Sequence, residues 1–314
     1  MSEAVPPELV ARFREALGRL NPEGRQIGLA VSGGPDSMAM LLLAHAAIPG
    51  RFAVATVNHG LRAEAADECA LVAAACAQRG IACEVLAIRV GEGNVQAEAR
   101  AARYAALCGW ADAQGLAAVA TAHHADDQAE TLLMRLNRGS GVAGLAGVRE
   151  RNQPSGFDCA VIRPLLHFRR AELAQVVAGE AVVHDPSNHD PRFDRVAMRQ
   201  NLAACDWLDP LAIARSASIL AEAYEAVEAY ADLLWPQAVR AEGSGYVITP
   251  VAAREMNRRL LARVLEKLGG RPRGGDVARL LMKLEAGEGG NVAGVLARVK
   301  RGEWVLGLEP VRRA

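Results

Sequence analysis

Apolar runs alternate with helix-like segments through the first half of the chain. Each run is short and rich in aliphatic residues, as buried β-strands are; the predicted strands cover residues 27–32, 52–57, 82–88, 117–121 and 161–162. The segments between them carry apolar residues at helical spacing and are followed by glycine or proline; the predicted helices cover residues 36–47, 64–78, 95–114 and 126–137. Strands that are separated by helical crossovers pair in parallel, with helices on both faces of the sheet.

The second half of the chain is predicted to be mainly helical. After about residue 186 helix-like segments dominate, at 213–234, 252–268 and 276–285. Trp235 and Pro236 are predicted to end the first of these helices, because proline interrupts a helix. Short β-like runs remain at 246–249, 295–298 and 304–308. The predicted fold class is therefore α/β, a parallel doubly wound sheet (domain 1–205) followed by a smaller, mostly α-helical domain (206–314).

The composition is that of a globular protein with ample material for a core. Of the 314 residues, 51% are hydrophobic and 23% are charged, which suggests roughly two folded domains. No run approaches the ~20 consecutive apolar residues that span a bilayer, and the N-terminal residues lack the apolar segment of a signal peptide. We therefore expect a cytoplasmic protein with no membrane partner.

The formal net charge is zero, but the two parts of the chain carry opposite charges. Residues 1–235 hold 21 arginines, no lysine and 28 acidic residues, a net charge of −7. Residues 236–314 hold 15 basic and eight acidic residues, a net charge of +7. A basic region of this size is typical of a nucleic-acid-binding surface, and a solvated helical face with scattered charge is an equally good interpretation.

A six-residue turn, Ser32-Gly33-Gly34-Pro35-Asp36-Ser37, joins the first predicted strand to the first predicted helix. Backbone N–H groups at such a turn and at a helix N-terminus bind anions, and adjacent glycines let a phosphate approach the backbone. The serine hydroxyls add donors, and Asp36 is suited to hold Mg²⁺ between phosphate oxygens. The common P-loop is excluded because it requires a lysine, and the three lysines stand far downstream, at positions 267, 283 and 300. A plain connecting turn is the alternative.

Further polar residues follow the second predicted strand, at the sheet edge where parallel sheets bind their ligands. His59 and Arg62 lie in the loop after this strand. An arginine in such a loop is suited to clamp a phosphate through two hydrogen bonds. A surface arginine beside a capping histidine is the alternative interpretation.

The densest polar cluster follows the fourth predicted strand and includes His123, His124, Asp126, Asp127 and Glu130. Asp127 and Glu130 are three residues apart and share one helix face, which suits a cationic substrate group or a metal. Capping of the helix N-terminus by the aspartates is the alternative. A zinc site is disfavoured, because adjacent histidines point in different directions and no third histidine or thiol stands at ligand spacing.

Two other features of the first half are candidates for substrate contacts. Arg100 and Arg103 share one face of the third predicted helix and are suited to bind phosphate or RNA, although surface arginines are common. The glycine-rich segment 138–147 is predicted to be a flexible loop that covers a substrate. The six cysteines include no Cys-x-x-Cys pair, which favours buried, inert thiols.

These motifs together resemble a known family. The turn at 32–37 resembles the PP-loop of ATP pyrophosphatases, which cleave ATP between the α and β phosphates to adenylate a substrate. Further segments resemble the tRNA(Ile)-lysidine synthetase family in chain order, at 57–62, 123–131, 138–145 and 185–188 with the arginines that follow. The resemblance implies a PP-loop, adenine nucleotide α-hydrolase-like domain over 1–205. It also implies a helical, basic tRNA-binding domain over 206–314.

The resemblance implies a ligase that acts on the wobble cytidine of tRNA(Ile) with a CAU anticodon. ATP would adenylate the C2 oxygen of the base and release pyrophosphate. The side-chain amine of free L-lysine would then attack C2 and expel AMP, which leaves lysidine and makes the anticodon read AUA. ATP and Mg²⁺ are the implied cofactors, and a homodimer is compatible with the resemblance.

The resemblance also implies roles for individual residues. The implied ATP-binding residues are Ser32, Gly33, Gly34, Pro35, Asp36, Ser37, His59 and Arg62, with Asp36 as the metal ligand. The implied catalytic residues are Asp36, Arg103 and Asp127. The implied lysine-binding residues are Asp127, Glu130, Arg195 and Arg199. The chain reads Val196 where the family usually has asparagine after the first of these arginines.

Three other functions remain open at this point. A tRNA thiolase uses the same adenylation but delivers sulfur, usually with paired cysteines that the spacing here does not show. A small-molecule amidotransferase of the same fold would need an ammonia-producing partner and would leave the basic C-terminal region unexplained. A non-enzymatic nucleotide-binding protein would release no pyrophosphate when supplied with ATP, lysine and tRNA.

Overall fold

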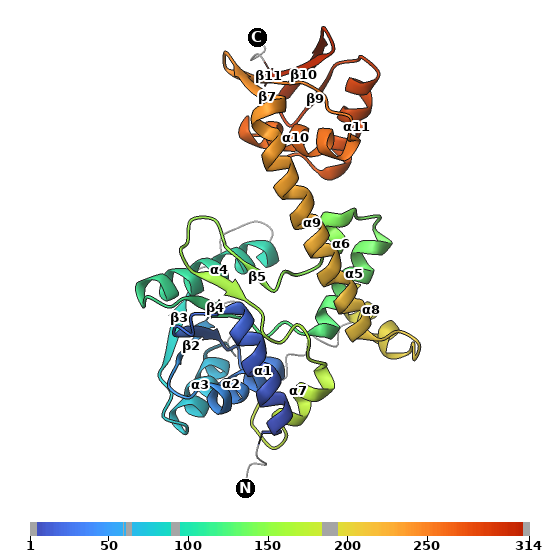
Figure 1. Ribbon diagram of the computed structural model, residues 1–314. Coiled ribbons are helices and arrows are strands. Elements are labelled where there is room, and N and C mark those ends of the chain that lie inside the picture. The colour runs from blue at the N-terminus through green and yellow to red at the C-terminus, as the bar shows by residue number, and fades with distance from the viewer. Residues whose placement is uncertain (1–4, 59, 61–64, 89–94, 184–193, 310–314) are drawn as a thin grey trace. The chain divides into compact units, whose positions relative to one another are not determined.

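The computed structural model describes residues 5–58, 60, 65–88, 95–183 and 194–309 (Figure 1). The chain divides into two compact units, Met1–Ala221 and Glu222–Ala314. Helix α9 (Pro210–Ala238) contributes residues to both units, and the domain boundary predicted after residue 205 lies just before this helix begins. Within the described ranges, no helix combines the length and apolar composition that a membrane crossing requires.

The first unit contains a six-stranded sheet with the order β3-β2-β1-β4-β6-β5. All neighbouring strands pair in parallel except the short edge pair β5–β6, which is antiparallel. The strands are β1 (Ile27–Ala30), β2 (Phe52–Asn58), β3 (Cys83–Ala87), β4 (Ala118–Ala120), β5 (Arg151–Asn152) and β6 (Ala160–Ile162). The chain winds from β1 outward to β3 and then returns to the other side of β1, so a switch point for ligand binding lies between β1 and β4.

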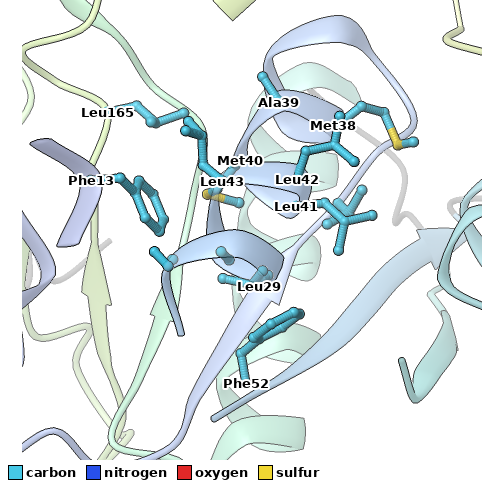
Figure 2. Close-up of a cluster of buried hydrophobic side chains, with 14 of the residues drawn as sticks. Phe13, Leu29, Met38, Ala39, Met40, Leu41, Leu42, Leu43, Phe52 and Leu165 are labelled. Atoms are coloured by element: carbon cyan, nitrogen blue, oxygen red, sulfur yellow. The ribbon is translucent and has the colours of Figure 1, made fainter. Parts of the chain in front are cut away.

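Helices cover both faces of this sheet, which confirms the doubly wound prediction. One face carries α1 (Pro7–Leu20), α2 (Pro35–Ala47), α3 (Ala65–Ala77) and α7 (Arg170–Val176). Their buried side chains share a cluster with Leu29 of β1 and Phe52 of β2 (Figure 2). The other face carries α4 (Val95–Ala113), whose Leu107 and Trp110 pack against Val119 of β4. Three more helices complete the unit before α9: α5 (Ala125–Asn137), α6 (Val142–Leu145) and α8 (Asp194–Ala203).

Helix α2, which follows the turn at 32–37, is buried over most of its length. Figure 2 shows Met38 to Leu43 of this helix among Phe13 of α1, Leu29 of β1 and Leu165. Residues 37–44 of this helix are all buried, so it has little freedom to shift. The turn at its N-terminus is therefore attached to the most rigid part of the unit.

The second unit is built on a five-stranded antiparallel sheet with the order β7-β8-β11-β10-β9. Its strands are β7 (Val239–Glu242), β8 (Gly245–Ile248), β9 (Gly290–Val292), β10 (Val295–Lys300) and β11 (Glu303–Leu308). Helices α10 (Arg254–Lys267) and α11 (Gly274–Glu285) share its core. The helices α10 and α11 and the end of α9 cover more residues than the five strands, as the prediction of a mostly helical domain requires. Strands β7 and β9 were not predicted from the sequence.

The predicted end of α9 at Trp235 and Pro236 is wrong, because the helix continues to Ala238 with Pro236 inside it. Proline removes one N–H donor from a helix. Pro236 lies in the last turn of α9, so the helix loses one backbone hydrogen bond there and still extends two residues further, to Ala238.

Glycine 28 of β1 allows the close approach of α4 to the sheet. A Cβ atom at this position would lie 2.4 Å from a ring carbon of Trp110. We therefore expect Gly28→Ala to destabilise the protein by roughly 1–3 kcal/mol through overpacking, measured by urea denaturation. Gly18→Ala is the matched control, because Gly18 is exposed on α1 and a Cβ there meets nothing within 4 Å. This variant should be stabilised by up to about 1 kcal/mol, and equal effects of the two changes would contradict the prediction.

Candidate active site

The six-residue turn lies between β1 and α2, where the sequence predicted it. The hydroxyl Oγ of Ser37 accepts a hydrogen bond from the Ser32 N–H at 3.1 Å and donates to the Gly34 carbonyl at 2.9 Å. Gly34 is the N-cap residue of α2 and Pro35 occupies its first turn. The first N–H groups of a helix have no partner inside it, so this closed turn presents donors to an anion.

Gly33 has a backbone conformation and surroundings that exclude a side chain. Its φ is +83°, in the left-handed region that favours glycine. A Cβ atom here would lie 2.8 Å from Cγ2 of Val183, whose N–H donates to the Gly33 carbonyl at 2.9 Å. Val183 thus holds the turn through a backbone hydrogen bond and a close side-chain approach at Gly33.

His124 joins the phosphate turn to the acidic helix α5. It is the N-cap residue of α5 and is completely buried. Its Nδ1 accepts from the Asp127 N–H at 3.4 Å, so we assign the ring proton to Nε2. Nε2 lies 3.4 Å from Oδ2 of Asp36 and 3.5 Å from Oδ2 of Asp127. One buried imidazole therefore contacts a carboxylate from each of the two predicted half-sites.

These contacts shift the pKa values of all three groups. Burial alone would raise the pKa of Asp36, but the contact with His124 and the nearby positive charges hold it below its usual value. Burial lowers the pKa of His124, yet Asp36 and Asp127 outweigh burial and raise it. The pKa of Asp127 is also lowered, because the attraction of His124 and Arg195 exceeds the effect of burial. Both carboxylates are therefore ionised at neutral pH.

Glu130 is the centre of a cluster of three arginines. Its carboxylate is 1% exposed. It accepts from Arg195 Nε at 2.8 Å, Arg199 Nε at 2.8 Å and Arg170 Nη2 at 3.1 Å. Arg195 also donates to Oδ1 of Asp127 at 2.8 Å. The structure thus brings together all four residues that the resemblance implied for lysine, although the arginines stand more than 60 positions from the acids.

The neighbourhood of Glu130 changes what this carboxylate can do. Burial raises its pKa, but the hydrogen bonds from Arg199 and Arg195 outweigh burial and lower it. A negative charge shared by three guanidinium groups attracts a further cation weakly, since the local charge is already positive. Asp127 is the more available carboxylate for an ammonium group.

A cavity of about 410 Å³ lies beside this cluster. Glu130, Arg170 and Arg199 form part of its wall, together with Asp126, Asp206 and Asp209. The wall therefore offers both carboxylates and guanidinium groups. A ligand that carries both signs of charge, such as a free amino acid, is complementary to this lining.

Two of the arginines named in the sequence analysis, Arg100 and Arg103, surround one tyrosine of α4. The guanidinium carbons of Arg100 and Arg103 lie 5.0 Å and 5.6 Å from the centre of the Tyr104 ring. Arg100 also donates to the Tyr104 hydroxyl at 3.4 Å. The helix thus presents two cations on one face, as predicted.

The comparisons with known proteins identify the family of the chain. A family model described as "PP-loop domain" matches residues 7–205. A tRNA(Ile)-lysidine synthase from Novosphingobium aromaticivorans is 49% identical over 310 residues, which cover 97% of this chain and 95% of that protein. The chain belongs to the tRNA(Ile)-lysidine synthase family. A second relative of the same name, from Zymomonas mobilis subsp. mobilis, is 38% identical and covers 93% of this chain and 92% of its own length.

The fold is also similar to that of a solved structure. The U34-tRNA thiolase NcsA from Methanococcus maripaludis, with its 4Fe–4S cluster, has a TM-score of 0.56 and 19% identity. The match covers 69% of this chain and 79% of that chain, and at this identity it shows the fold alone. Membership of the tRNA(Ile)-lysidine synthase family confirms the resemblance stated above. The chain is therefore an ATP-dependent ligase.

Some predicted elements of the site lie outside the described residues or differ from expectation. His59, Arg62 and the segment 185–188 are outside the described residues. The glycine-rich segment 138–147 contains the short helix α6. Arg135 donates to the Gly144 carbonyl at 2.7 Å, which anchors the segment to α5.

Four of the six cysteines are buried as predicted, whereas Cys83 and Cys205 are half-buried. The side chains of Cys108 and Cys159 contact each other, and this contact raises the pKa of Cys159. The sequence spacing alone did not indicate this pairing. Both thiols are buried in the cluster beneath α4.

Two residues of the site, Arg163 and Arg170, were not predicted from the sequence, and neither was the contact of His124 with Asp36. Arg163 directly follows β6, at the same sheet edge as the phosphate turn and His123. The rule that ligands bind at the carboxyl ends of parallel strands could have identified it. Arg170 gives no such signal, because it begins a helix and reaches Glu130 only through the fold.

The turn fits a magnesium ion that is held mainly by phosphate oxygens. Mg²⁺ usually takes one or two protein carboxylates plus substrate phosphates and water. The side chain of Asp36 is one-third exposed, beside the N–H groups of the turn, and its lowered pKa keeps it ionised. Asp36 is therefore the residue that would hold the ion. Among the described residues, no group of three or more His, Cys, Asp or Glu side chains forms a metal site.

Replacing Glu130 should destabilise the first unit in a pH-dependent way. Glu130→Gln leaves three guanidinium groups without their shared carboxylate, and we expect a loss of about 3–5 kcal/mol at pH 7 in urea denaturation. Because the arginines lower the pKa of Glu130, its stabilisation is complete above the unfolded value of about 4.3. That stabilisation is lost as pH falls through the folded value. The difference between wild type and variant should therefore shrink in acid.

The control for this prediction is Glu15→Gln. Glu15 is exposed and pairs with Arg19 at 3.5 Å. Its substitution should change the free energy of unfolding by less than about 0.5 kcal/mol. A Glu130→Gln difference that stayed constant from pH 7 to acid would contradict the charge-based explanation.

Proposed function

We propose that this chain attaches free lysine to C2 of the wobble cytidine of tRNA(Ile), through an adenylated base, with release of pyrophosphate and AMP. The observation that carries the proposal is the pair of contacts made by His124, which joins Asp36 of the phosphate turn to Asp127 of α5. An adenylation site and an amine-binding site must be adjacent for this reaction, because both substrates meet at one carbon atom. The converted CAU anticodon would read AUA.

In the first half-reaction, the C2 oxygen of cytidine attacks the α-phosphate of ATP and pyrophosphate leaves. The N–H groups of the turn, with Ser32 and Ser37, bind the leaving pyrophosphate and stabilise the charge that develops on it. Asp36 would hold Mg²⁺, which supplies further charge neutralisation at the phosphates. His124 keeps the Asp36 carboxylate in place from the buried side.

In the second half-reaction, the lysine amine attacks C2 and AMP leaves. We infer that Asp127 binds the amine and accepts its proton, because Asp127 is less saturated by arginines than Glu130. Glu130 then acts by fixing Arg195 and Arg199, and Arg199, which lines the cavity, binds the substrate carboxylate. This assignment keeps all four implied lysine-binding residues but separates their tasks.

The nearby cavity supports lysine as the amine. Its aspartates Asp126, Asp206 and Asp209 are suited to an ammonium group, and its arginines are suited to a carboxylate. Free lysine carries two ammonium groups and one carboxylate. A cavity with this lining favours lysine over an amino acid whose side chain is neutral.

The decisive test is mass spectrometry of the wobble nucleoside after incubation of a tRNA(Ile) transcript with ATP and lysine. The proposal expects a mass gain of one lysine less one water, which depends on all three substrates. Asp36→Ala should slow pyrophosphate release by roughly 100-fold, because it removes the charge that holds the metal. Sulfur incorporation in place of lysine, or no pyrophosphate release by the wild type, would refute the proposal.

We further propose that the second unit binds tRNA through its basic surface. The hairpin between β10 and β11 carries Arg298, Lys300 and Arg301. Arg301 has a φ of +52° and precedes Gly302 at +81°, as a two-residue type I′ turn requires. A non-glycine residue in this conformation costs roughly 1–2 kcal/mol. Such a cost is consistent with a charge that is kept for binding.

Arg301→Gly should therefore change stability and binding in opposite directions. Glycine relieves the strained turn, so we expect a gain of up to about 1 kcal/mol in stability. The lost charge should weaken tRNA binding and reduce its salt dependence. Ala293→Gly is the matched control, because Ala293 has a φ of +53° in the β9–β10 turn and carries no charge. It should gain stability with unchanged tRNA affinity, measured by filter binding; unchanged affinity of Arg301→Gly would contradict the prediction.

A further inference from the structure

Arg163 is a buried cation without an acidic partner. Its side chain is 5% exposed and stands directly after β6, at the carboxyl edge of the sheet. One terminal nitrogen donates to the Arg149 carbonyl at 2.6 Å and to Oδ1 of Asn152 at 2.7 Å, but Nε has no hydrogen-bond partner. No described carboxylate lies within 4.0 Å of this guanidinium group. A buried charge of this kind is costly unless an opposite charge balances it.

Two more unbalanced arginines lie near Arg163. Arg100 and Arg103 flank Tyr104 on α4. Burial lowers the pKa of Arg163, and both Tyr104 and Arg100 are close enough to act on it as well. In the part of the chain that the structure covers, neither Arg100 nor Arg103 forms an ion pair with a carboxylate. Tyr104 packs in the cluster beneath α4, so it fixes the spacing of the three cations. The three guanidinium groups thus converge from α4 and β6.

The neighbouring cluster at Glu130 provides the contrast. There, three arginines share one buried carboxylate, and Asp127 takes a second hydrogen bond from Arg195. The ring of His123, beside Arg163, is uncharged at neutral pH. Burial and the positive charges of Arg163 and Arg100 lower the pKa of His123 to about 4, so it is neutral at pH 7. The carboxylate that acts on His123 is that of Asp127, which is paired with Arg195 at 2.8 Å. Arg100, Arg103 and Arg163 therefore leave a positive net charge at this place, as at a binding site for an anion.

The position of the cluster on the sheet indicates which anion it binds. The phosphate turn follows β1, and the predicted nucleotide contacts His59 and Arg62 follow β2, on one side of the switch point. Arg163 follows β6, on the other side, beyond β4. ATP that extends from the turn towards β2 leaves the β4–β6 side to the second substrate. Guanidinium groups match phosphate oxygens through paired hydrogen bonds.

We propose that Arg100, Arg103 and Arg163 bind a backbone phosphate of the tRNA anticodon loop, next to the cytidine that reacts. The proposal rests on the proposed function, since it takes tRNA as the second substrate. It assigns to Arg103 a positioning role for the RNA rather than a direct part in the chemistry. A phosphate held here fixes the neighbouring nucleotide against the adenylation site, which raises the rate by orientation.

The test measures tRNA and ATP binding separately in Arg103→Gln and Arg163→Lys. Arg103 is exposed, so its substitution should leave the fold intact, and lysine at 163 keeps the charge but lacks Nε. We expect each variant to bind the tRNA(Ile) transcript roughly tenfold more weakly, with a salt slope smaller by about 1 for Arg103→Gln. ATP binding measured by calorimetry without tRNA should stay within twofold of wild type. Because the two arginines share one phosphate, their effects in the double variant should be less than additive.

Arg151→Gln is the matched control. Arg151 is an exposed arginine of the neighbouring strand β5 and donates to the Leu20 carbonyl at 2.8 Å. Its loss should not affect tRNA affinity. If Arg163→Lys does not fold, Arg103→Gln and Arg100→Gln decide the question.

Unchanged tRNA affinity in the folded variants, or a loss of ATP affinity instead, would overturn this site. If the wild type forms lysidine and these variants bind tRNA normally, only the phosphate site is wrong. If the wild type forms no lysidine, the proposed function itself fails. The tRNA-binding measurements on the variants still test whether the three arginines bind RNA.

Discussion

The contact of buried His124 with Asp36 and Asp127 is the interaction on which the rest of the site depends. It connects two elements that belong to different crossovers of the sheet, the turn after β1 and the helix after β4. The turn is fixed because residues 37–44 of α2 are all buried, and α5 is fixed because His124 and Asp127 cap its N-terminus reciprocally. The two half-sites are therefore held next to each other by a single buried ring.

The balance of charges around this contact determines which side chains stabilise the fold and which are available to a substrate. Burying Glu130 would be unfavourable without a partner, and three arginines from α7 and α8 supply more positive charge than the carboxylate needs. The ion pairs of Arg195 and Arg199 with Glu130 attach α8 to α5, and Arg170 and Arg199 also line the adjacent cavity. Packing and substrate recognition are thus performed by the same ion pairs, so a substitution at Glu130 should affect both.

Much of this arrangement could be predicted from local sequence. Strands β1 to β4 and the turn at 32–37 follow from apolar runs and glycines, which are short-range signals. Helix α1 was missed, although Leu9, Phe13, Leu17 and Leu20 recur at helical spacing. The saturation of Glu130 by arginines could not be predicted, because it depends on side chains 40 to 69 positions away. The strand pairing of the second unit is likewise long-range.

The comparison of the two arginine clusters shows how structural cations can be separated from binding cations. At Glu130 every guanidinium has a carboxylate within 3.1 Å, and the cluster is complete as it stands. At Arg163 one terminal nitrogen has two oxygen acceptors, but Nε is buried without a hydrogen-bond partner. Folding alone gives no reason to bury such a donor, because a leucine or methionine would pack there without the desolvation cost. We infer that a ligand supplies the missing acceptor, and at the carboxyl edge of this sheet a substrate phosphate fits that role.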